Sequence, residues 1–346
     1  MIKLSNISSY LVNGDIPLRE ALLRLNQSEV PFLLVVNTKR QLLGTVTDGD
    51  IRRGVLGGAK LDDPLSACVH LKPLTAREDE ADLSALLRRV AFVPIVNGGN
   101  QVIGVALRDT VDPDVSDAVV MAGGLGTRLG SLTKAVPKPL LPVAGRPILE
   151  HILTSLEAAG VRRIWITVNH LSEQIERFAR DREGLAKLEI LHERARLGTA
   201  GGIGLLGERP LGPFFVVNGD VLTETDFRAM AAFHRKHGYD GTIAVAHHQV
   251  KVPFGVIRHE SGIFAGIDEK PVIRQFVAGG IYLFGPEVLA MVPPNQPLDM
   301  PDLLNDAHSI GLRLGLFPIH EYWTDVGHPE DLRAADERHR RGVNDD

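Results

Sequence analysis

Cysteine and long apolar stretches are what this chain has least of. Cys68 is the only cysteine among 346 residues, so no disulfide can form within the chain. No apolar run approaches the roughly 20 residues that a membrane-spanning helix needs. The first residues, MIKLSNISSYLVNG, do not join a basic start to a long apolar core as a signal peptide does. We therefore expect a cytoplasmic protein without a membrane partner.

An excess of positive charge is also missing. The formal net charge is -5 and no block of basic residues occurs, which argues against a nucleic-acid polymer as partner. Any cationic phosphate site must therefore be local. The hydrophobic share of 44% is ample for packed cores, and the length suggests about two domains.

A glycine-rich loop follows an apolar strand in the middle of the chain. Residues 117–121 read as a buried strand, and Gly123, Gly124 and Gly126 then allow a sharp turn that brings backbone N–H groups close to an anion. Arg128 offers a forked donor for phosphate oxygens, and Lys138, between two prolines, offers a point charge. Taken alone, the glycines fit equally well a loop that needs them only for packing.

The extended pattern, GGLGTRL followed by PKPLLPVAGRP, departs from both the dinucleotide fingerprint and the P-loop. It resembles the signature of the sugar-1-phosphate nucleotidyltransferases. The segment LGTAGGIGLL (197–206) resembles the part of that family that contacts the nucleotide base. The resemblance implies these nucleotide-binding residues: Ala122, Gly123, Gly124, Gly126, Thr127, Gly198 and Thr199.

Helix and strand patterns alternate after the loop. Residues 147–159 predict an amphipathic helix, 163–168 a strand, 172–179 a second helix and 213–218 a second buried strand. This alternation predicts an α/β fold with a Rossmann-like, mostly parallel twisted sheet, and ligands at the carboxyl ends of its strands. We assign residues 117–346 to this nucleotidyltransferase domain.

Two aspartates from distant parts of the chain suggest a metal site. Asp220 follows the buried strand FFVVN, and Asp325 follows Tyr322 and Trp323. Two carboxylates suit Mg²⁺ when phosphate oxygens and water supply its other ligands, although either aspartate alone is equally typical of a turn. The resemblance implies that both aspartates bind the metal.

The resemblance also implies a sugar-phosphate pocket. Gly255 in PFGVI, Glu269 and Lys270 in DEKP, and Gly280 in AGGIYLF match its motifs. For Glu269 and Lys270 the alternative is a solvated charge pair beside a proline turn. One departure stands ahead of the LGTAG segment: family members often carry an acidic residue there, whereas this chain has Arg194, Ala195 and Arg196.

The first third of the chain contains an internal repeat. FLLVVNTKRQLLGTV (32–46) aligns with FVPIVNGGNQVIGVA (92–106), and a segment of helical period precedes each copy. The unit resembles a tandem pair of CBS domains, with copies at about 1–58 and 61–112, and residues 108–116 predict a short linker. Thr47 and Asp50 match the CBS nucleotide pattern in copy one, whereas copy two has Leu107 and Thr110 at these positions. The alternative is that the repeat only holds subunits together.

These resemblances imply a defined reaction. A sugar-1-phosphate would attack the α-phosphorus of a nucleoside triphosphate, giving a nucleotide sugar and pyrophosphate, with Arg128, Lys138, Asp220 and Asp325 as the catalytic set. A CBS pair joined to this domain resembles guanylyltransferases that act on hexose- or hexosamine-1-phosphates, and this resemblance implies GTP in preference to CTP or UTP. A homo-oligomer formed through the CBS pair and regulation by a nucleotide bound there are further expectations. Two alternatives stay open: an inactive regulatory subunit that senses nucleotides or nucleotide sugars, and an assembly scaffold.

Overall fold

The computed structural model describes residues 2–4, 7–28, 30–78, 80, 83–107 and 115–342. The chain divides into two compact units, Met1–Asp112 and Pro113–Asp346, called here the N-terminal and the C-terminal unit. Most of the linker expected at residues 108–116 lies outside the described residues. Within the described residues, no helix combines the length and the apolar character that crossing a bilayer requires.

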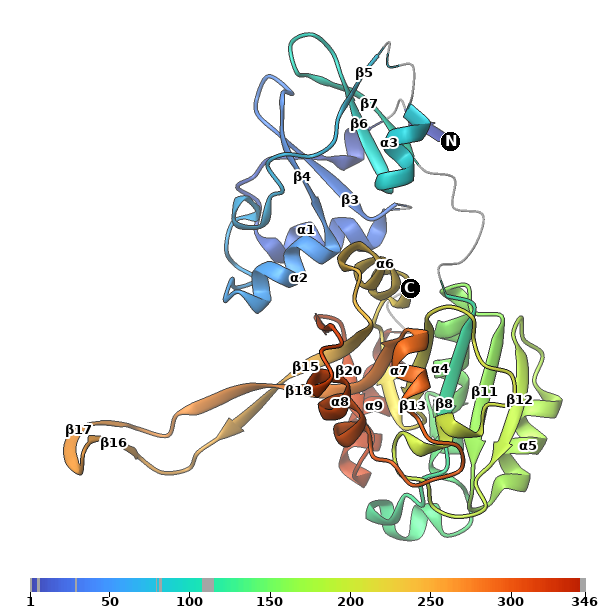
Figure 1. Cartoon of the computed structure of the whole chain (residues 1–346). Helices are drawn as coiled ribbons and strands as arrows, with labels where there is room; N and C mark the ends of the chain where they lie inside the picture. Colours follow the sequence, from blue (N-terminus) through green and yellow to red (C-terminus); the bar gives the residue numbers. More distant parts are fainter. Residues whose placement is uncertain are drawn as a thin grey trace. The chain divides into compact units, whose positions relative to one another are not determined.

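The N-terminal unit contains two similar layers (Figure 1). The first layer comprises β2 (Leu11–Val12), α1 (Leu18–Gln27), β3 (Phe32–Val36), β4 (Leu42–Thr47) and α2 (Asp48–Leu56). The second comprises β5 (Ala76–Arg77), α3 (Leu83–Arg89), β6 (Phe92–Val96) and β7 (Val102–Leu107), with β1 (Ile2–Leu4) pairing on β7. The order strand, helix, strand, strand is therefore repeated.

The two layers meet in a reciprocal contact. Gln41 donates from its side-chain amide to the carbonyl of Gly99, and Gln101 donates in the same way to the carbonyl of Lys39. Phe32 stacks on Phe92 with ring centroids 4.3 Å apart. Such a self-matching contact is what two copies related by an approximate twofold axis make.

The C-terminal unit is built on a seven-stranded sheet. Its strand order is β12-β11-β8-β13-β18-β15-β19, and β18 alone in this sheet runs against the others. The strands are β8 (Asp117–Met121), β11 (Arg163–Val168), β12 (Lys187–His192), β13 (Phe214–Asn218), β15 (Gly241–Lys251), β18 (Val272–Phe284) and β19 (Leu314–Pro318). The expected mostly parallel α/β sheet is confirmed.

Helices cover both faces of this sheet because its strands are apolar on both sides. Val120 and Ile166 pack in the layer with Leu156 of α4, whereas Val119 and Trp165 face Leu303 of α8. The helices are α4 (Ile148–Ala158), α5 (Ser172–Asp181), α6 (Phe227–His237), α7 (Pro286–Ala290), α8 (Met300–Ser309) and α9 (Pro329–Gly342). Near the sheet lie the pairs β9 (Pro142–Val143) with β10 (Arg146–Pro147) and β14 (Val221–Thr223) with β20 (Trp323–Asp325).

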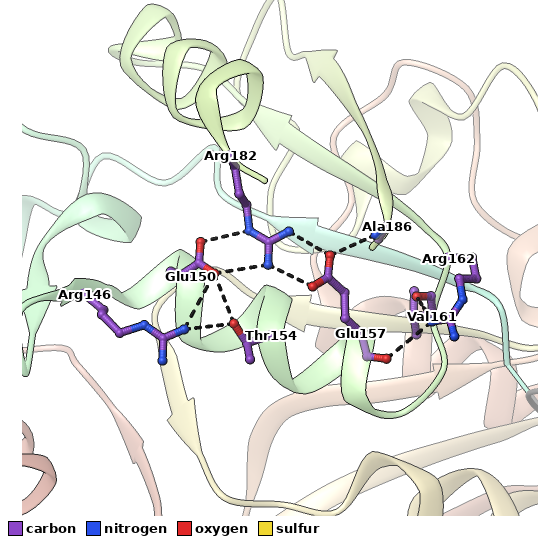
Figure 2. Close-up of polar contacts among 8 residues, drawn as sticks. All are labelled: Arg146, Glu150, Thr154, Glu157, Val161, Arg162, Arg182 and Ala186. Carbon is purple, nitrogen blue, oxygen red and sulfur yellow. Dashed lines mark hydrogen bonds and ion pairs between the residues drawn. The ribbon is translucent and has the colours of Figure 1, made fainter. Parts of the chain in front are cut away.

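A buried arginine ties α4 to the segment that follows α5. Arg182 binds Glu150 and Glu157, which lie two turns apart on α4, through four hydrogen bonds of 2.7–3.1 Å (Figure 2). Its side chain is 6% exposed. The hydrogen bonds from Arg182 hold the pKa of Glu157 below its usual range. This ion-pair cluster fixes α4 to the segment between α5 and β12, where the Ala186 amide also donates to Glu157.

Two strands leave the sheet as a long hairpin. β15 and β18 continue as a two-stranded ribbon beyond the sheet, and the ribbon ends in β16 (Val256–Glu260) and β17 (Ile263–Asp268) (Figure 1). Residues 247–277 are called the arm. A bulge at Gly279 and Gly280 separates the arm from the sheet, because Ile243 pairs with Tyr282 but Val245 pairs with Ala278.

Candidate active site

The glycine loop and Asp220 meet at the point where the strand order of the sheet reverses. β8 has β11 on one side and β13 on the other, so the loop after β8 and the residues after β13 leave the same edge of the sheet side by side. Such a switch point is where open α/β sheets bind ligands. The amide of Gly219 donates to the carbonyl of Met121 at 2.9 Å, which joins the two segments directly.

Glycine is required at particular places in this loop. Gly126 has φ +63°, and a Cβ there would lie 2.9 Å from Thr133 Cγ2 and 3.1 Å from Lys138 Cβ. The carbonyl of Gly126 accepts a hydrogen bond from Thr133 Oγ1 at 2.9 Å. Gly126 therefore lets the loop pack closely against the segment that holds Lys138. Packing alone is enough to require glycine at this position, whether or not the loop also binds an anion.

A second glycine leads to a residue that the sequence analysis missed. A Cβ on Gly123 would lie 2.6 Å from Glu193 Oε1. Glu193 follows β12 directly and is buried, and burial raises the pKa of its carboxyl group. Glu193 directly precedes Arg194, and the sequence analysis did not name it. Its position after a strand next to β11 was the signal that would have revealed it.

Lys138 and the two aspartates form one cluster. Lys138 Nζ lies 2.5 Å from Asp220 Oδ2 and 3.5 Å from Asp325 Oδ1. The Lys138 side chain is 8% exposed, whereas those of Asp220 and Asp325 are 27% and 44% exposed. The carboxylates therefore converge on one point while part of each stays open to a ligand.

Local pairing explains why residues 105 positions apart meet. β14 follows Asp220 and pairs with β20, and Val221 stands opposite Asp325. The amide of Val326 donates to the carbonyl of Asp220 at 3.1 Å. Burial raises the pKa of Asp325, and the Asp220 carboxylate adds to this rise, whereas Lys138 and Arg128 oppose it. A further cation would relieve this repulsion, so the oxygen donors present fit a divalent metal ion.

Arg128 lies at the edge of the same cluster. It belongs to the 3₁₀ segment Thr127–Thr133 that follows the glycine loop, and its side chain is exposed. A Cβ on Gly327 would lie 3.6 Å from Arg128 Nη1 and 3.9 Å from Asp325 Oδ2. The structure thus brings together Arg128, Lys138, Asp220 and Asp325, the four residues that the sequence analysis assigned to catalysis.

Gly198 and Thr199 stand against the start of α8. The Thr199 amide donates to Asp299 Oδ1 at 3.0 Å, and Thr199 Oγ1 accepts from the Met300 amide at 2.7 Å. Gly198 has φ +77°, and a Cβ there would lie 2.6 Å from Asp299 Oδ1. These contacts give both residues a structural task, the docking of the LGTAG segment on α8. Their role toward a nucleotide stays a prediction.

The predicted sugar-phosphate residues are divided between the body of the unit and the arm. Gly280 has φ +68°, and a Cβ there would lie 2.8 Å from Asn218 Nδ2, so it stands beside the end of β13. Gly255, Glu269 and Lys270 lie in the arm. The side chains of Glu269 and Lys270 are 70% and 60% exposed, with a 3.9 Å ion pair between them. No contact recorded among the described residues joins them to Asp220 or Asp325.

In the N-terminal unit, Thr47 and Asp50 contact each other. The Thr47 amide and hydroxyl donate to Asp50 Oδ2 at 2.9 and 2.6 Å, which caps α2, and Asp50 also forms an ion pair with Arg53. The Asp50 side chain is buried. Both residues therefore stabilise the beginning of a helix, as a capping box does. Nucleotide binding by them stays a prediction.

Fold and site together define an α/β unit with acidic and basic groups gathered at the switch point of its mostly parallel sheet. Residues 117–341 match the nucleotidyl transferase family, and residues 7–57 match the CBS domain family. The first match covers well over half of the chain. The chain therefore belongs to the nucleotidyl transferase family, and the resemblance of its first repeat to a CBS domain is confirmed.

The most similar curated proteins include guanylyltransferases. The chain is 34% identical over 225 residues to mannose-1-phosphate guanylyltransferase catalytic subunit beta of Xenopus tropicalis, a match that covers 62% of each chain. It is 35% identical over 229 residues to mannose-1-phosphate guanyltransferase of Schizosaccharomyces pombe, which covers 62% of this chain and 61% of the relative. The match thus spans somewhat less than two thirds of these relatives.

Solved structures share the same fold. HddC from Yersinia pseudotuberculosis is 25% identical with a TM-score of 0.51, and the match covers 65% of this chain and 100% of HddC. A putative glucose-1-phosphate thymidylyltransferase from Bacillus anthracis is 24% identical with a TM-score of 0.52, covering 65% of this chain and 95% of that one. At this identity the second likeness concerns the fold alone.

Proposed function

We propose that this protein transfers a guanylyl group from GTP to a hexose- or hexosamine-1-phosphate, releasing pyrophosphate and a GDP-sugar. The observation that carries the proposal is the convergence of Lys138, Asp220 and Asp325 on one point at the switch point of the sheet. The choice of GTP as the nucleotide substrate is supported by the similarity to relatives named mannose-1-phosphate guanylyltransferase and mannose-1-phosphate guanyltransferase. The location of the reaction would be the cytoplasm, where both substrate classes occur.

The chemistry needs little from the protein beyond position and charge. An oxygen of the sugar phosphate, anionic near neutral pH, forms a bond to the α-phosphorus of GTP, while the bond from that phosphorus to the bridging oxygen of pyrophosphate breaks. Arg128 would stabilise the charge that gathers on the departing pyrophosphate. Lys138 and Lys270 would hold the phosphate of the sugar. No proton has to be removed from the nucleophile by a protein base.

Asp220 and Asp325 would hold a Mg²⁺ ion. Their carboxylates are hard oxygen donors held on adjacent strands and directed to one point, and each keeps exposed surface. When bound there, Mg²⁺ would supply positive charge to the α-phosphate oxygens. Lys138 also faces both carboxylates and provides positive charge beside them.

The decisive experiment measures pyrophosphate release with Mg²⁺ across the four nucleoside triphosphates and a panel of sugar-1-phosphates. We expect release with GTP and a hexose- or hexosamine-1-phosphate. Asp220→Asn and Arg128→Ala should each lower turnover by about two orders of magnitude or more, the scale of losing one electrostatic contact to a transition state. Asp306→Asn, at an exposed aspartate of α8, is the matched control and should keep wild-type turnover.

Two results would contradict the proposal. Near-normal turnover in both purified variants would remove these residues from the chemistry. If the wild-type protein released no pyrophosphate with any pair of substrates but still bound nucleotide, that result would favour the regulatory subunit instead.

For the N-terminal unit we propose a tandem CBS pair that assembles subunits and binds a regulatory nucleotide beside Thr47 and Asp50. The repeated element order and the reciprocal Gln41 and Gln101 contacts support a pair of like domains. Calorimetric titration of the full chain with adenine and guanine nucleotides, compared with a Thr47→Val variant, tests the site. Equal affinities in the two proteins would remove Thr47 from it.

A further inference from the structure

Lys138 places its ammonium group between the two carboxylates that the proposed function assigns to the metal ion. Its Nζ lies 2.5 Å from Asp220 Oδ2 and 3.5 Å from Asp325 Oδ1, and its side chain is 8% exposed. Each aspartate therefore turns one oxygen toward the same cation. A metal ion held by both carboxylates needs these oxygens or the space beside them. Lys138 and the ion would thus compete for one place.

Arg128 adds positive charge on another side of Asp325. A Cβ on Gly327 would lie 3.6 Å from Arg128 Nη1 and 3.9 Å from Asp325 Oδ2. The Asp331 carboxylate lies beside Gly327 as well, where it accepts a hydrogen bond from the His328 amide at 2.7 Å. The two aspartates of the cluster are thus already faced by two cations. A divalent ion that joins them meets like charge, which additional anionic ligands such as phosphate oxygens would offset.

The backbone of Lys138 is fixed, but the end of its side chain is not. Pro137 and Pro139 flank the residue, and the Leu141 amide donates to its carbonyl at 3.1 Å. Its Cβ lies against the glycine loop, where a Cβ on Gly126 would be only 3.1 Å away. The four-carbon stem of lysine, in contrast, can turn about each of its bonds. The ammonium group alone can therefore leave the carboxylates for a phosphate within its reach.

We propose that Lys138 gates the metal site: its ammonium group keeps the affinity of Asp220 and Asp325 for a divalent cation low until a substrate phosphate draws it away. The proposal rests on the proposed function, which assigns the two aspartates to the metal ion and Lys138 to a phosphate. The ion then binds together with phosphate and not before it. Because such coupling is reciprocal, phosphate and metal ion strengthen each other's binding by the same factor.

Binding of Mn²⁺ to the full-length protein without any substrate tests the gate, with the electron paramagnetic resonance signal of the ion as readout. Mn²⁺ prefers the same oxygen ligands as Mg²⁺, and competition by Mg²⁺ checks that the two ions share the site. We expect Lys138→Met to bind Mn²⁺ about tenfold more tightly than wild type, or tighter still, because a like charge beside the ion is removed. Lys138→Arg keeps this charge and should stay close to the wild-type affinity.

Two further variants locate the effect. Lys134→Met removes the same charge from an exposed lysine of the same segment and should leave Mn²⁺ affinity unchanged. Lys138→Met combined with Asp220→Asn should lose the gain, because one of the two carboxylates no longer carries charge. Mn²⁺ binding by Lys138→Met that is equal to or weaker than wild-type binding would overturn the proposal. So would a gain that persists in the double variant, since the ion would then be bound elsewhere.

Thermal unfolding with and without Mg²⁺ is a second measurement that needs no activity. Mg²⁺ at about ten times its Kd for Lys138→Met should raise the Tm of this variant by about 4 °C and that of the wild type by about 1 °C. Equal shifts would contradict the gate. If Lys138→Met does not fold, Lys138→Gln takes its place in both measurements with the same expectations.

The two proposals fail in different ways. A wild-type protein that is inactive on every substrate pair would remove the proposed reaction, whereas tighter Mn²⁺ binding by Lys138→Met would still support the gate. An active wild type whose Mn²⁺ affinity does not change in Lys138→Met would overturn the gate and leave the reaction in place.

Discussion

The body of the C-terminal unit and the arm both carry residues assigned to substrate, but they hold them in opposite ways. Lys138 is nearly buried and is held by Asp220 and Asp325, which come from two other segments of the chain. Glu269 and Lys270 pair only with each other, at 3.9 Å and largely in solvent. An exposed ion pair of this kind contributes little to stability. The body thus positions its site residues by buried contacts between segments, whereas the arm leaves Glu269 and Lys270 in solvent.

The sharpest test of this contrast removes one arginine from each region. Arg182→Met should lower the free energy of unfolding by about 3–5 kcal/mol, because it leaves Glu150 and Glu157 without their buried partner. Arg258→Met, which breaks an exposed ion pair with Asp268 in the arm, should cost at most about 1 kcal/mol. Urea unfolding followed by tryptophan fluorescence measures both, since Trp165 and Trp323 lie in the C-terminal unit.

The Arg182 effect should also depend on pH with a definite sign. Because the pKa of Glu157 is lowered in the folded protein, the stability from its pairing is present above the usual glutamate pKa of about 4.3. That stability is lost as the pH falls through the lowered pKa. The difference between wild type and Arg182→Met should therefore shrink on acidification. A constant difference would show that the cost comes from packing and not from charge.

A pair of glycines tests the root of the arm against its tip. Gly280 and Gly262 have φ of +68° and +86°, so alanine is strained at both, by about 1–2 kcal/mol. At Gly280 the new Cβ would also lie 2.8 Å from Asn218 Nδ2, whereas at Gly262 no heavy atom lies within 4 Å. We expect Gly280→Ala to lower both stability and turnover, and Gly262→Ala to leave the tryptophan-detected unfolding unchanged. Equal effects on that unfolding would show that the tip is part of the cooperative body.

The smallest expected effect is a stability gain inside the active site. Because the pKa of Asp325 is raised in the folded protein, the folded state binds more protons than the unfolded state between the ordinary aspartate pKa, about 3.9, and the raised value. Its stability therefore falls as the pH rises through that window. Asp325→Asn should raise Tm at pH 7 by about 2 °C, with no gain at pH values below about 4. A lower Tm at pH 7 would mean that Asp325 stabilises the fold through Lys138.

The sequence predicted the C-terminal sheet closely. The strands at 117–121 and 163–168 have the predicted bounds, and the helix expected at 147–159 spans Ile148–Ala158. Apolar runs, a proline before the helix and a glycine after it are local signals. They predict an element without any knowledge of the segments that pack against it. Glu193 was missed although it directly follows a strand, because its proximity to Gly123, 70 positions away, is visible only in the fold.

The sequence by itself determined which residues could act: the glycines that bend the loop, the cations that follow it, the aspartates after two strands and the arm's EKP motif. Only the tertiary structure decided which of these meet. Asp220 and Asp325 converge because β14 pairs with β20, and Lys138 joins them because Gly126 closes the loop beside it. Gly279 and Gly280 lie at a register shift between β15 and β18, and Glu269 comes only after the paired residues beyond it. Strands that are distant in the sequence pair through long-range contacts, and no local sequence pattern specifies which strand pairs with which.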